Sequence, residues 1–117
     1  MREINHVLQG YASSFALNYN VKFVPVPYTN PMGKVFGGVA TFSRYKPTES
    51  TRIQYPGKFP WPTRIFFLDR CFLTQRYPLA NGKELIVINT HNSAYDETGE
   101  IKGGEMKALK EYVEAEY

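Results

Sequence analysis

The residues best suited to chemistry follow an apolar run, in the segment LIVINTHNSAYD at residues 85–96. Hydrogen-bonding side chains crowd the end of this run, namely Asn89, Thr90, His91, Asn92 and Ser93. A histidine at the C-terminal end of a buried strand can donate a proton to an oxygen whose charge grows during a reaction. We therefore take His91 as the candidate catalytic residue. The alternative is a histidine that only bonds to a neighbouring loop.

A charged pair interrupts the apolar segment FFLDRCFL at residues 66–73. The guanidinium of Arg70 is permanently charged and has forked donors, which suit a phosphate group. Without a phosphate, Asp69 or Arg70 would form an ion pair with a neighbouring strand, or Arg70 would extend along the surface. Arg70 is accordingly the candidate phosphate-binding residue.

The turn between two strands sets the expected distance between these residues. Asn81 and Gly82 favour a two-residue type I′ hairpin loop, because both central residues of that turn need positive φ. Such a loop pairs Phe72 with His91 and Thr74 with Asn89, which brings Arg70 onto the same face, with its Cα about 7–8 Å from that of His91. A longer loop would reverse these faces.

The elements that would carry these residues follow from hydrophobic periodicity. Apolar residues at helical spacing predict a helix over residues 4–19, and a second helix is predicted over 103–117. Strands are predicted at 21–28, 35–45, 64–77 and 83–91, with a short strand at 51–54 inside the long connection 46–63. We expect one mainly antiparallel α+β domain, and the connection 46–63 is the expected specificity element.

Composition excludes several classes of protein. The chain has 117 residues, a net charge of +3 and 43% hydrophobic residues, so it is no disordered polyelectrolyte. No apolar run reaches the roughly 18 residues of a membrane helix, so we expect no membrane span. The single cysteine, Cys71, rules out an internal disulfide, and no metal-ligand spacing or phosphate-binding P-loop is present. The compartment stays unknown, and a secreted or periplasmic location stays open.

Two segments together resemble the endonuclease/exonuclease/phosphatase, or deoxyribonuclease I-like, superfamily. GGVATFSRY at residues 37–45 is similar to the strand of that superfamily in which glycine and apolar residues precede Ser-Arg. DRCFLTQRYPLANGKELIVINTHNSAYD at residues 69–96 is similar to its arginine-bearing strand, hairpin and Asn-Thr-His strand end. The order and spacing of the two segments match as well.

This resemblance implies a four-layer α/β/β/α sandwich and a phosphoesterase that uses a divalent metal, usually Mg²⁺. It implies that His91 contacts the scissile phosphate and assists the leaving oxygen, and that Arg70 lies beside the phosphate. Asn89 and Asn92 are the expected neighbours in phosphate binding. The superfamily includes nucleases, sphingomyelinases and inositol-phosphate phosphatases, and the sequence does not choose among these substrates.

The chain departs from the superfamily pattern in its metal ligands and its catalytic base. The metal-binding Glu should end a strand before the first helix, and Glu3 does not match that position. The Asp-x-Asn motif and the terminal Asp-His of the superfamily would lie beyond Tyr117. We therefore expect residues 1–117 to be a single partial domain, truncated at both ends, inactive alone and self-associating through an exposed sheet face.

The alternative function is that of a small non-catalytic α+β module. In this reading Trp61, the tyrosines and Arg70 bind a sugar or a nucleic acid, because aromatic rings stack on sugars and bases. Trp61 could equally pin the long connection to the core, and His6 is expected to be solvated. Cleavage of a phosphodiester that depends on His91 would exclude the non-catalytic module.

Overall fold

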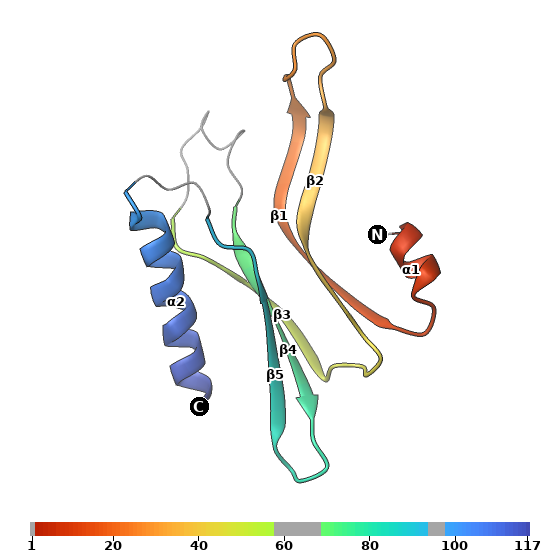
Figure 1. The fold of residues 1–117 in the computed structure, drawn as a ribbon, viewed down its shortest axis with the longest axis vertical. Helices are drawn as coiled ribbons and strands as arrows, with labels where there is room; N and C mark the ends of the chain where they lie inside the picture. Colours follow the sequence, from red (N-terminus) through yellow and green to blue (C-terminus); the bar gives the residue numbers. More distant parts are fainter. Residues whose placement is uncertain (1, 58–68, 94–97) are drawn as a thin grey trace.

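The computed structural model describes residues 2–57, 69–93 and 98–117 of the chain (Figure 1). These residues form an α+β structure of two helices and five strands. In chain order the elements are α1 (Arg2–Val7), β1 (Ala12–Val24), β2 (Gly33–Ser43), β3 (Glu49–Gln54), β4 (Cys71–Pro78), β5 (Glu84–Thr90) and α2 (Glu100–Glu116). The predicted strands at 35–45, 51–54 and 83–91 and the second helix are therefore confirmed. The strand predicted at 21–28 ends at Val24 as part of β1, and the strand predicted at 64–77 begins at Cys71 among the described residues, whereas residues 64–68 lie outside the described part.

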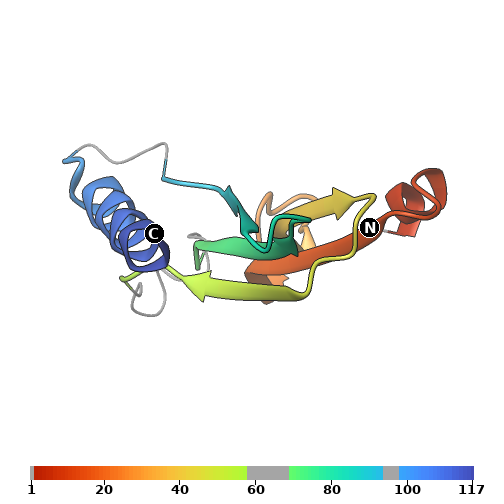
Figure 2. The same cartoon turned by 90° about the horizontal axis from the view of Figure 1, so that it is seen from below.

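The strands form two antiparallel sheets that are stacked as layers. β1 pairs with β2, and the second sheet has the order β3-β4-β5. Viewed from below, α2, the three-stranded sheet and the β1–β2 hairpin follow one another from left to right (Figure 2). The three-stranded sheet thus has α2 on one face and the hairpin on the other.

The predicted helix over residues 4–19 is wrong. α1 ends at Val7, and Gly10 has a φ of 87°, a left-handed conformation that stops a helix. From Ala12 onward the chain pairs with β2 over the full length of both strands, with Ala12 opposite Ser43 and Val24 opposite Gly33. The apolar residues at helical spacing favour a helix only weakly. Hydrogen bonding to β2 and side-chain packing against the other sheet favour a strand more strongly, so residues from Ala12 onward form β1.

The β4–β5 turn also differs from the prediction, by one residue. Leu79 donates its N–H to the carbonyl of Lys83, which leaves a three-residue loop of Ala80, Asn81 and Gly82. Gly82 has a φ of 77°, and no non-glycine residue in the described ranges has positive φ, so the turn is not type I′. The shift pairs Phe72 with Thr90 instead of His91, and Leu73 with Asn89. Every face assignment that depended on the shorter loop is reversed.

The contact between the two sheets is a small apolar core with polar links beside it. Ala16 and Val39 of the hairpin meet Cys71 and Leu73 of β4, and all four side chains are buried. Gln75, also buried, donates from its amide to Ser14 Oγ at 3.0 Å. The hairpin therefore covers the face of the β3–β4–β5 sheet that we had expected to be exposed in this chain, and self-association stays a prediction.

The opposite face of the sheet packs against α2 through aromatic rings. Phe72 is 1% exposed and lies 5.2 Å from the ring centroid of Tyr55 and 5.3 Å from that of Tyr112 in α2. Arg76 of β4 and Glu116 at the end of α2 form an ion pair that adds a second attachment. Neither described helix combines the length and the apolar character that crossing a bilayer requires.

Candidate functional site

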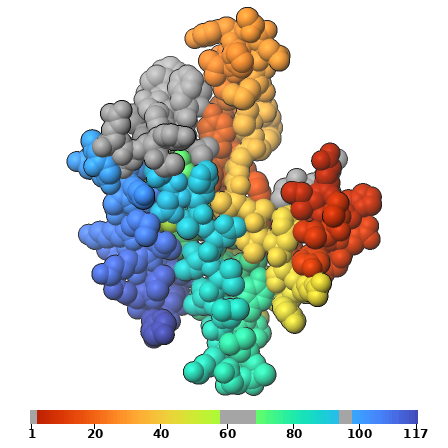
Figure 3. Space-filling model, viewed as in Figure 1, coloured from red at the N-terminus to blue at the C-terminus, as the bar shows by residue number. Residues whose placement is uncertain are grey.

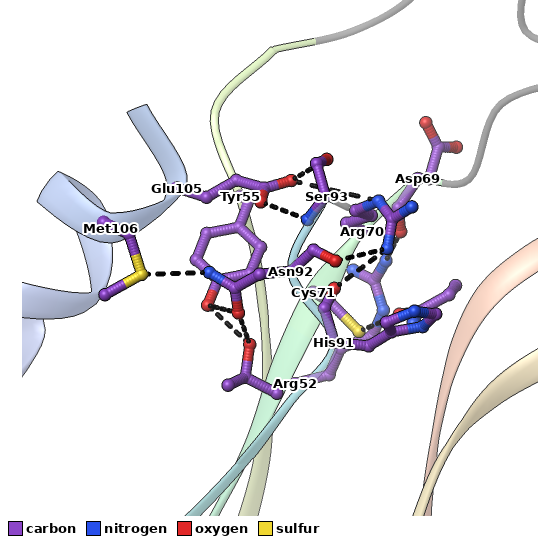
Figure 4. Close-up of polar contacts among 12 residues, drawn as sticks. Arg52, Tyr55, Asp69, Arg70, Cys71, His91, Asn92, Ser93, Glu105 and Met106 are labelled. Carbon is purple, nitrogen blue, oxygen red and sulfur yellow. Dashed lines mark hydrogen bonds and ion pairs between the residues drawn. The ribbon is translucent and has the colours of Figure 1, made fainter. Parts of the chain in front are cut away.

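The candidate residues lie where three strands end at one edge of the sheet (Figure 4). Tyr55 follows β3, Arg70 precedes β4 and His91 follows β5, and Tyr55 N–H donates to the Arg70 carbonyl at 3.0 Å. We call the side of the β3–β4–β5 sheet that packs against α2 the α2 face, and the side that packs against β1 and β2 the hairpin face. In the observed register Arg70 is on the α2 face with Phe72, whereas His91 is on the hairpin face with Cys71. The predicted placement of Arg70 and His91 on one face is therefore wrong. The side chain of Arg70 nevertheless bonds directly to the backbone of His91.

Arg70 makes this link through its guanidinium. Its Nη1 donates to the carbonyl oxygen of His91 at 3.3 Å and to that of Asn92 at 3.0 Å. Its Nε lies 4.0 Å from Glu105 Oε1 in α2, and the Arg70 side chain is only 19% exposed. Arg70 thus holds the backbone on both sides of the bond between His91 and Asn92, and no hydrogen bond joins its Nη2 to a described residue.

Glu105 is the residue that sequence reasoning missed. Its side chain is 2% exposed, and its two oxygens accept hydrogen bonds from the backbone N–H of Ser93 at 2.7 Å and from Ser93 Oγ at 2.8 Å. A buried carboxylate needs such donors, because burial without them would strongly disfavour its charge. The sequence contained a signal: Glu105 is four residues before Leu109 and seven before Tyr112, which places it on the inner stripe of α2.

A second set of contacts fixes Asn92, one of the predicted phosphate-binding residues. Its Oδ1 accepts a hydrogen bond from Thr90 Oγ1 at 2.8 Å and a longer one from the Tyr55 hydroxyl at 3.5 Å. Its Nδ2 donates to the sulfur of Met106 in α2 at 3.2 Å. Burial raises the pKa of Tyr55, and the hydrogen bond with Thr90, at 2.6 Å, opposes that rise. The Asn92 side chain is therefore engaged in holding α2 to the sheet.

Asn89, the other predicted phosphate-binding asparagine, lies between the two sheets. Its Nδ2 donates to the carbonyl of Ala40 at 3.0 Å and to Thr41 Oγ1 at 3.1 Å. These contacts join β5 to β2 and lie on the same face of β5 as His91. Phosphate binding by Asn89 stays a prediction that its contacts do not support.

His91 is the exposed member of this group. No described residue forms a hydrogen bond with its imidazole, and its side chain is solvent-accessible. Its backbone is nonetheless held by Arg70, and the next two residues are held by Tyr55, Thr90 and Glu105. The strand end thus presents one reactive side chain to solvent from a backbone that is fixed on either side.

Arg52 is a further cation on the hairpin face that the sequence analysis did not single out. Arg52 is opposite Leu73 in the β3–β4 ladder, so it shares a face with Cys71 and His91. Its Nε donates to the Leu17 carbonyl at 2.9 Å, and its Nη2 donates to the Asp69 carbonyl at 3.4 Å. Burial raises the pKa of the Cys71 thiol, and the nearby Arg52 charge opposes that rise.

A polar cavity of about 390 Å³ opens beside Arg52. Its other lining residues are Asp69 and the five residues 17–21 of β1, at the irregular pairing between Leu17 and Tyr19. Asn18 lies in this stretch and accepts a hydrogen bond from the Cys71 thiol. His91 does not line this cavity, so the cavity and the exposed imidazole are separate features of one face.

The described residues do not supply a site for the expected Mg²⁺. No group of three or more His, Cys, Asp or Glu side chains converges within residues 2–57, 69–93 and 98–117. Glu105, the buried carboxylate closest to the candidate residues, is already satisfied by Ser93. Trp61, on which the alternative binding module depends, lies outside the described residues.

Comparisons of the chain with protein-family models, with curated proteins and with solved structures found no match.

Proposed function

We propose that residues 69–93 form the phosphate-contacting part of a metal-dependent phosphoesterase, a hydrolase of the endonuclease/exonuclease/phosphatase type. The observation that carries this proposal is the state of His91, whose imidazole is exposed and unbonded among the described residues while its backbone is held by Arg70. A residue that only stabilised the fold would be expected to use its imidazole in that network. The side chains of its neighbours Thr90, Asn92 and Ser93 all form hydrogen bonds in that network.

The layer order of the molecule supports the proposal. Helix α2, the β3–β4–β5 sheet and the β1–β2 sheet correspond in order to three of the four layers expected of an α/β/β/α sandwich (Figure 2). In the proposed complete domain, a further helical layer covers the outer face of β1 and β2. Phe15 and Phe36 are 43% and 55% exposed in the two-stranded sheet, which leaves apolar surface for such a layer.

In the proposed site, an imidazole N–H of His91 donates a hydrogen bond to a phosphate oxygen just beyond the end of β5. Arg70 positions His91 through the two backbone carbonyls, and its Nη2 is left for an anion at the strand end. Arg52 adds positive charge on the face from which His91 projects. No step is assigned to Mg²⁺, because the described residues do not hold it.

Binding of a phosphodiester to the chain tests the proposal without requiring turnover. We expect isothermal titration with bis-p-nitrophenyl phosphate to show saturable binding that His91→Ala weakens about tenfold or more, since a hydrogen bond to a charged group contributes about 1.5–3 kcal/mol. His6→Ala is the matched control, because His6 is an exposed histidine in α1, away from the strand ends. Equal binding by both variants would contradict the proposal.

A further inference from the structure

The β1–β2 hairpin carries charge of one sign only. No Asp or Glu occurs between Glu3 and Glu49, whereas this stretch contains Lys22, Lys34, Arg44 and Lys46. The Arg44 guanidinium already forms a hydrogen bond, because its Nε donates to the Tyr11 hydroxyl at 2.8 Å, at the end of the hairpin away from the turn. Lys22 and Lys34 are left as the cations near the turn that joins β1 to β2.

The turn itself projects from the body of the molecule and exposes large apolar side chains. It forms the orange protrusion at the top of Figure 3. Phe23, Tyr28 and Met32 are 58%, 86% and 59% exposed there, although each could bury most of its surface in a core. All three lie within residues 23–32, so exposed apolar surface is concentrated towards the tip of this hairpin.

The two lysines lie directly behind this apolar tip. Both fall between the Val21–Val35 pair and the Val24–Gly33 pair of the ladder, so they lie at one level on adjacent strands. Lys34 Nζ lies 4.6 Å from the ring centroid of Phe36. Phe23 lies in the same interval as the lysines, whereas Tyr28 and Met32 lie beyond it in the turn. Apolar groups in the turn and ammonium groups one level behind them match the depth profile of a membrane interface, where side chains insert about 5–10 Å and lysines reach the headgroups.

We propose that the tip of the β1–β2 hairpin, residues 22–34, docks the protein onto the surface of an anionic lipid bilayer. Tyr28 and Met32 enter the boundary between headgroups and acyl chains, where tyrosine is favoured, and Phe23 adds apolar surface at the level of the lysines. Lys22 and Lys34 meet the anionic headgroups, and the absence of acidic residues between positions 4 and 48 removes repulsion from the bilayer. This docking does not depend on the proposed phosphoesterase function.

Single-stranded nucleic acid is the competing partner for a basic and aromatic surface, and the geometry favours it less. Bases stack on ring faces within a groove that follows the phosphate backbone, whereas this tip is convex (Figure 3). Met32 and the prolines at positions 25, 27 and 31 offer no aromatic ring for base stacking. The ring of Phe36 is already beneath the Lys34 ammonium.

Sedimentation with sucrose-loaded vesicles tests the docking. We expect the 117-residue chain to bind phosphatidylcholine vesicles that contain phosphatidylglycerol, and to bind pure phosphatidylcholine vesicles much more weakly. The double variant Lys22→Gln/Lys34→Gln should lower the partition coefficient about 30-fold, because each lysine near an anionic surface contributes roughly a factor of five. Tyr28→Ser should lower it about tenfold, and added salt should weaken binding of the unaltered chain.

The β4–β5 hairpin provides the matched control. Its turn also exposes an apolar residue, Leu79, and a lysine, Lys83, but Glu84 follows immediately. The double variant Leu79→Ser/Lys83→Gln should bind vesicles as the unaltered chain does. Equal binding to neutral and anionic vesicles, loss of binding in this control, or tip variants that lose affinity for a single-stranded oligonucleotide and not for vesicles would each overturn the proposal.

Discussion

Both faces of the β3–β4–β5 sheet are covered, but they differ in whether the polar side chains at the strand end are hydrogen-bonded or exposed to solvent. On the α2 face, Arg70 and Asn92 are tied to backbone carbonyls and to Met106, and Glu105 beside them is fully engaged. On the hairpin face, Asn89 is tied to β2, whereas His91, two residues further along, reaches solvent. One face holds the strand end in place, and the other presents a reactive group.

This difference follows from the alternation of side chains along a strand. Thr90, His91 and Asn92 are consecutive, so the outer two point to the α2 face and the middle one to the hairpin face. Positioning and reactivity can thus be assigned to adjacent residues without competing for the same space. The comparison predicts that substitutions of the bonded residues, Glu105 on the α2 side above all, change stability most and that substitution of His91 changes binding most.

The largest effect is expected at Glu105. Glu105→Gln keeps the side-chain volume but removes the negative charge. That charge accepts two hydrogen bonds from Ser93 and lies beside the Arg70 guanidinium, so its loss should lower the free energy of unfolding by about 3 kcal/mol. Urea denaturation followed by circular dichroism measures this change. Glu111→Gln is the control on the same helix, because Glu111 is 64% exposed in a surface pair with Lys107 and should change stability by less than about 0.5 kcal/mol. Similar losses in both variants would contradict the role given to Glu105.

A smaller effect is expected on the hairpin face, at Asn89. Asn89→Ala removes the amide that bonds to the Ala40 carbonyl and to Thr41, so we expect a loss of about 2 kcal/mol. The same denaturation experiment measures it. Asn20→Ala, at an exposed position of β1, should change stability by less than about 0.5 kcal/mol. If Asn89→Ala is as mild as that control, the contact between the sheets is not held by Asn89.

Tyr55 should show a modest effect that depends on pH. Tyr55→Phe removes a hydroxyl bonded to Thr90, at a cost of about 1 kcal/mol near neutral pH. Burial raises the pKa of Tyr55 in the folded chain above the 10.0 of the free side chain, so the unfolded state loses its proton first and stability falls as pH rises above 10. The variant should lack this part of the decline, and the difference between the two proteins should narrow between neutral pH and pH 11. A constant difference over that range would argue against the raised pKa.

The smallest effect on stability is expected at His91. His91→Ala removes an exposed side chain that no described residue bonds, so the free energy of unfolding should change by less than about 0.5 kcal/mol. The same variant should lose affinity for a phosphodiester. A loss of more than 2 kcal/mol of stability would show that His91 belongs to the structural network after all.

Two strands of the central sheet and the C-terminal helix were predictable from the sequence, because β3 and β5 are short runs with strand character and residues 103–117 have helical spacing. β1 was not, because its apolar residues fit a helical spacing and only pairing with β2 resolves the ambiguity. That error concerns the N-terminal third of the chain. It leaves the segment that carries His91 unaffected.

The site was partly predictable. His91 and Arg70 do meet at the strand end, but through the Arg70 guanidinium and a backbone carbonyl rather than on a shared face. The error arose because Asn-Gly in a hairpin is compatible with loops of two or three residues, and a one-residue change reverses every face. Glu105 has helical spacing to Leu109 and Tyr112, but its contacts, like those of Arg52, could not be assigned without knowing which helix and strand faces pack together.

The most direct test of the account is a nuclear magnetic resonance titration of the two histidines with bis-p-nitrophenyl phosphate. His6 and His91 are both exposed, so His6 reports non-specific effects within the same sample. We predict that the imidazole signals of His91 shift along a saturable curve, that the Arg70 Nε signal shifts with the same affinity, and that His6 stays unchanged. Equal shifts of His6 and His91, or no shift of either, would contradict a phosphate site at the end of β5.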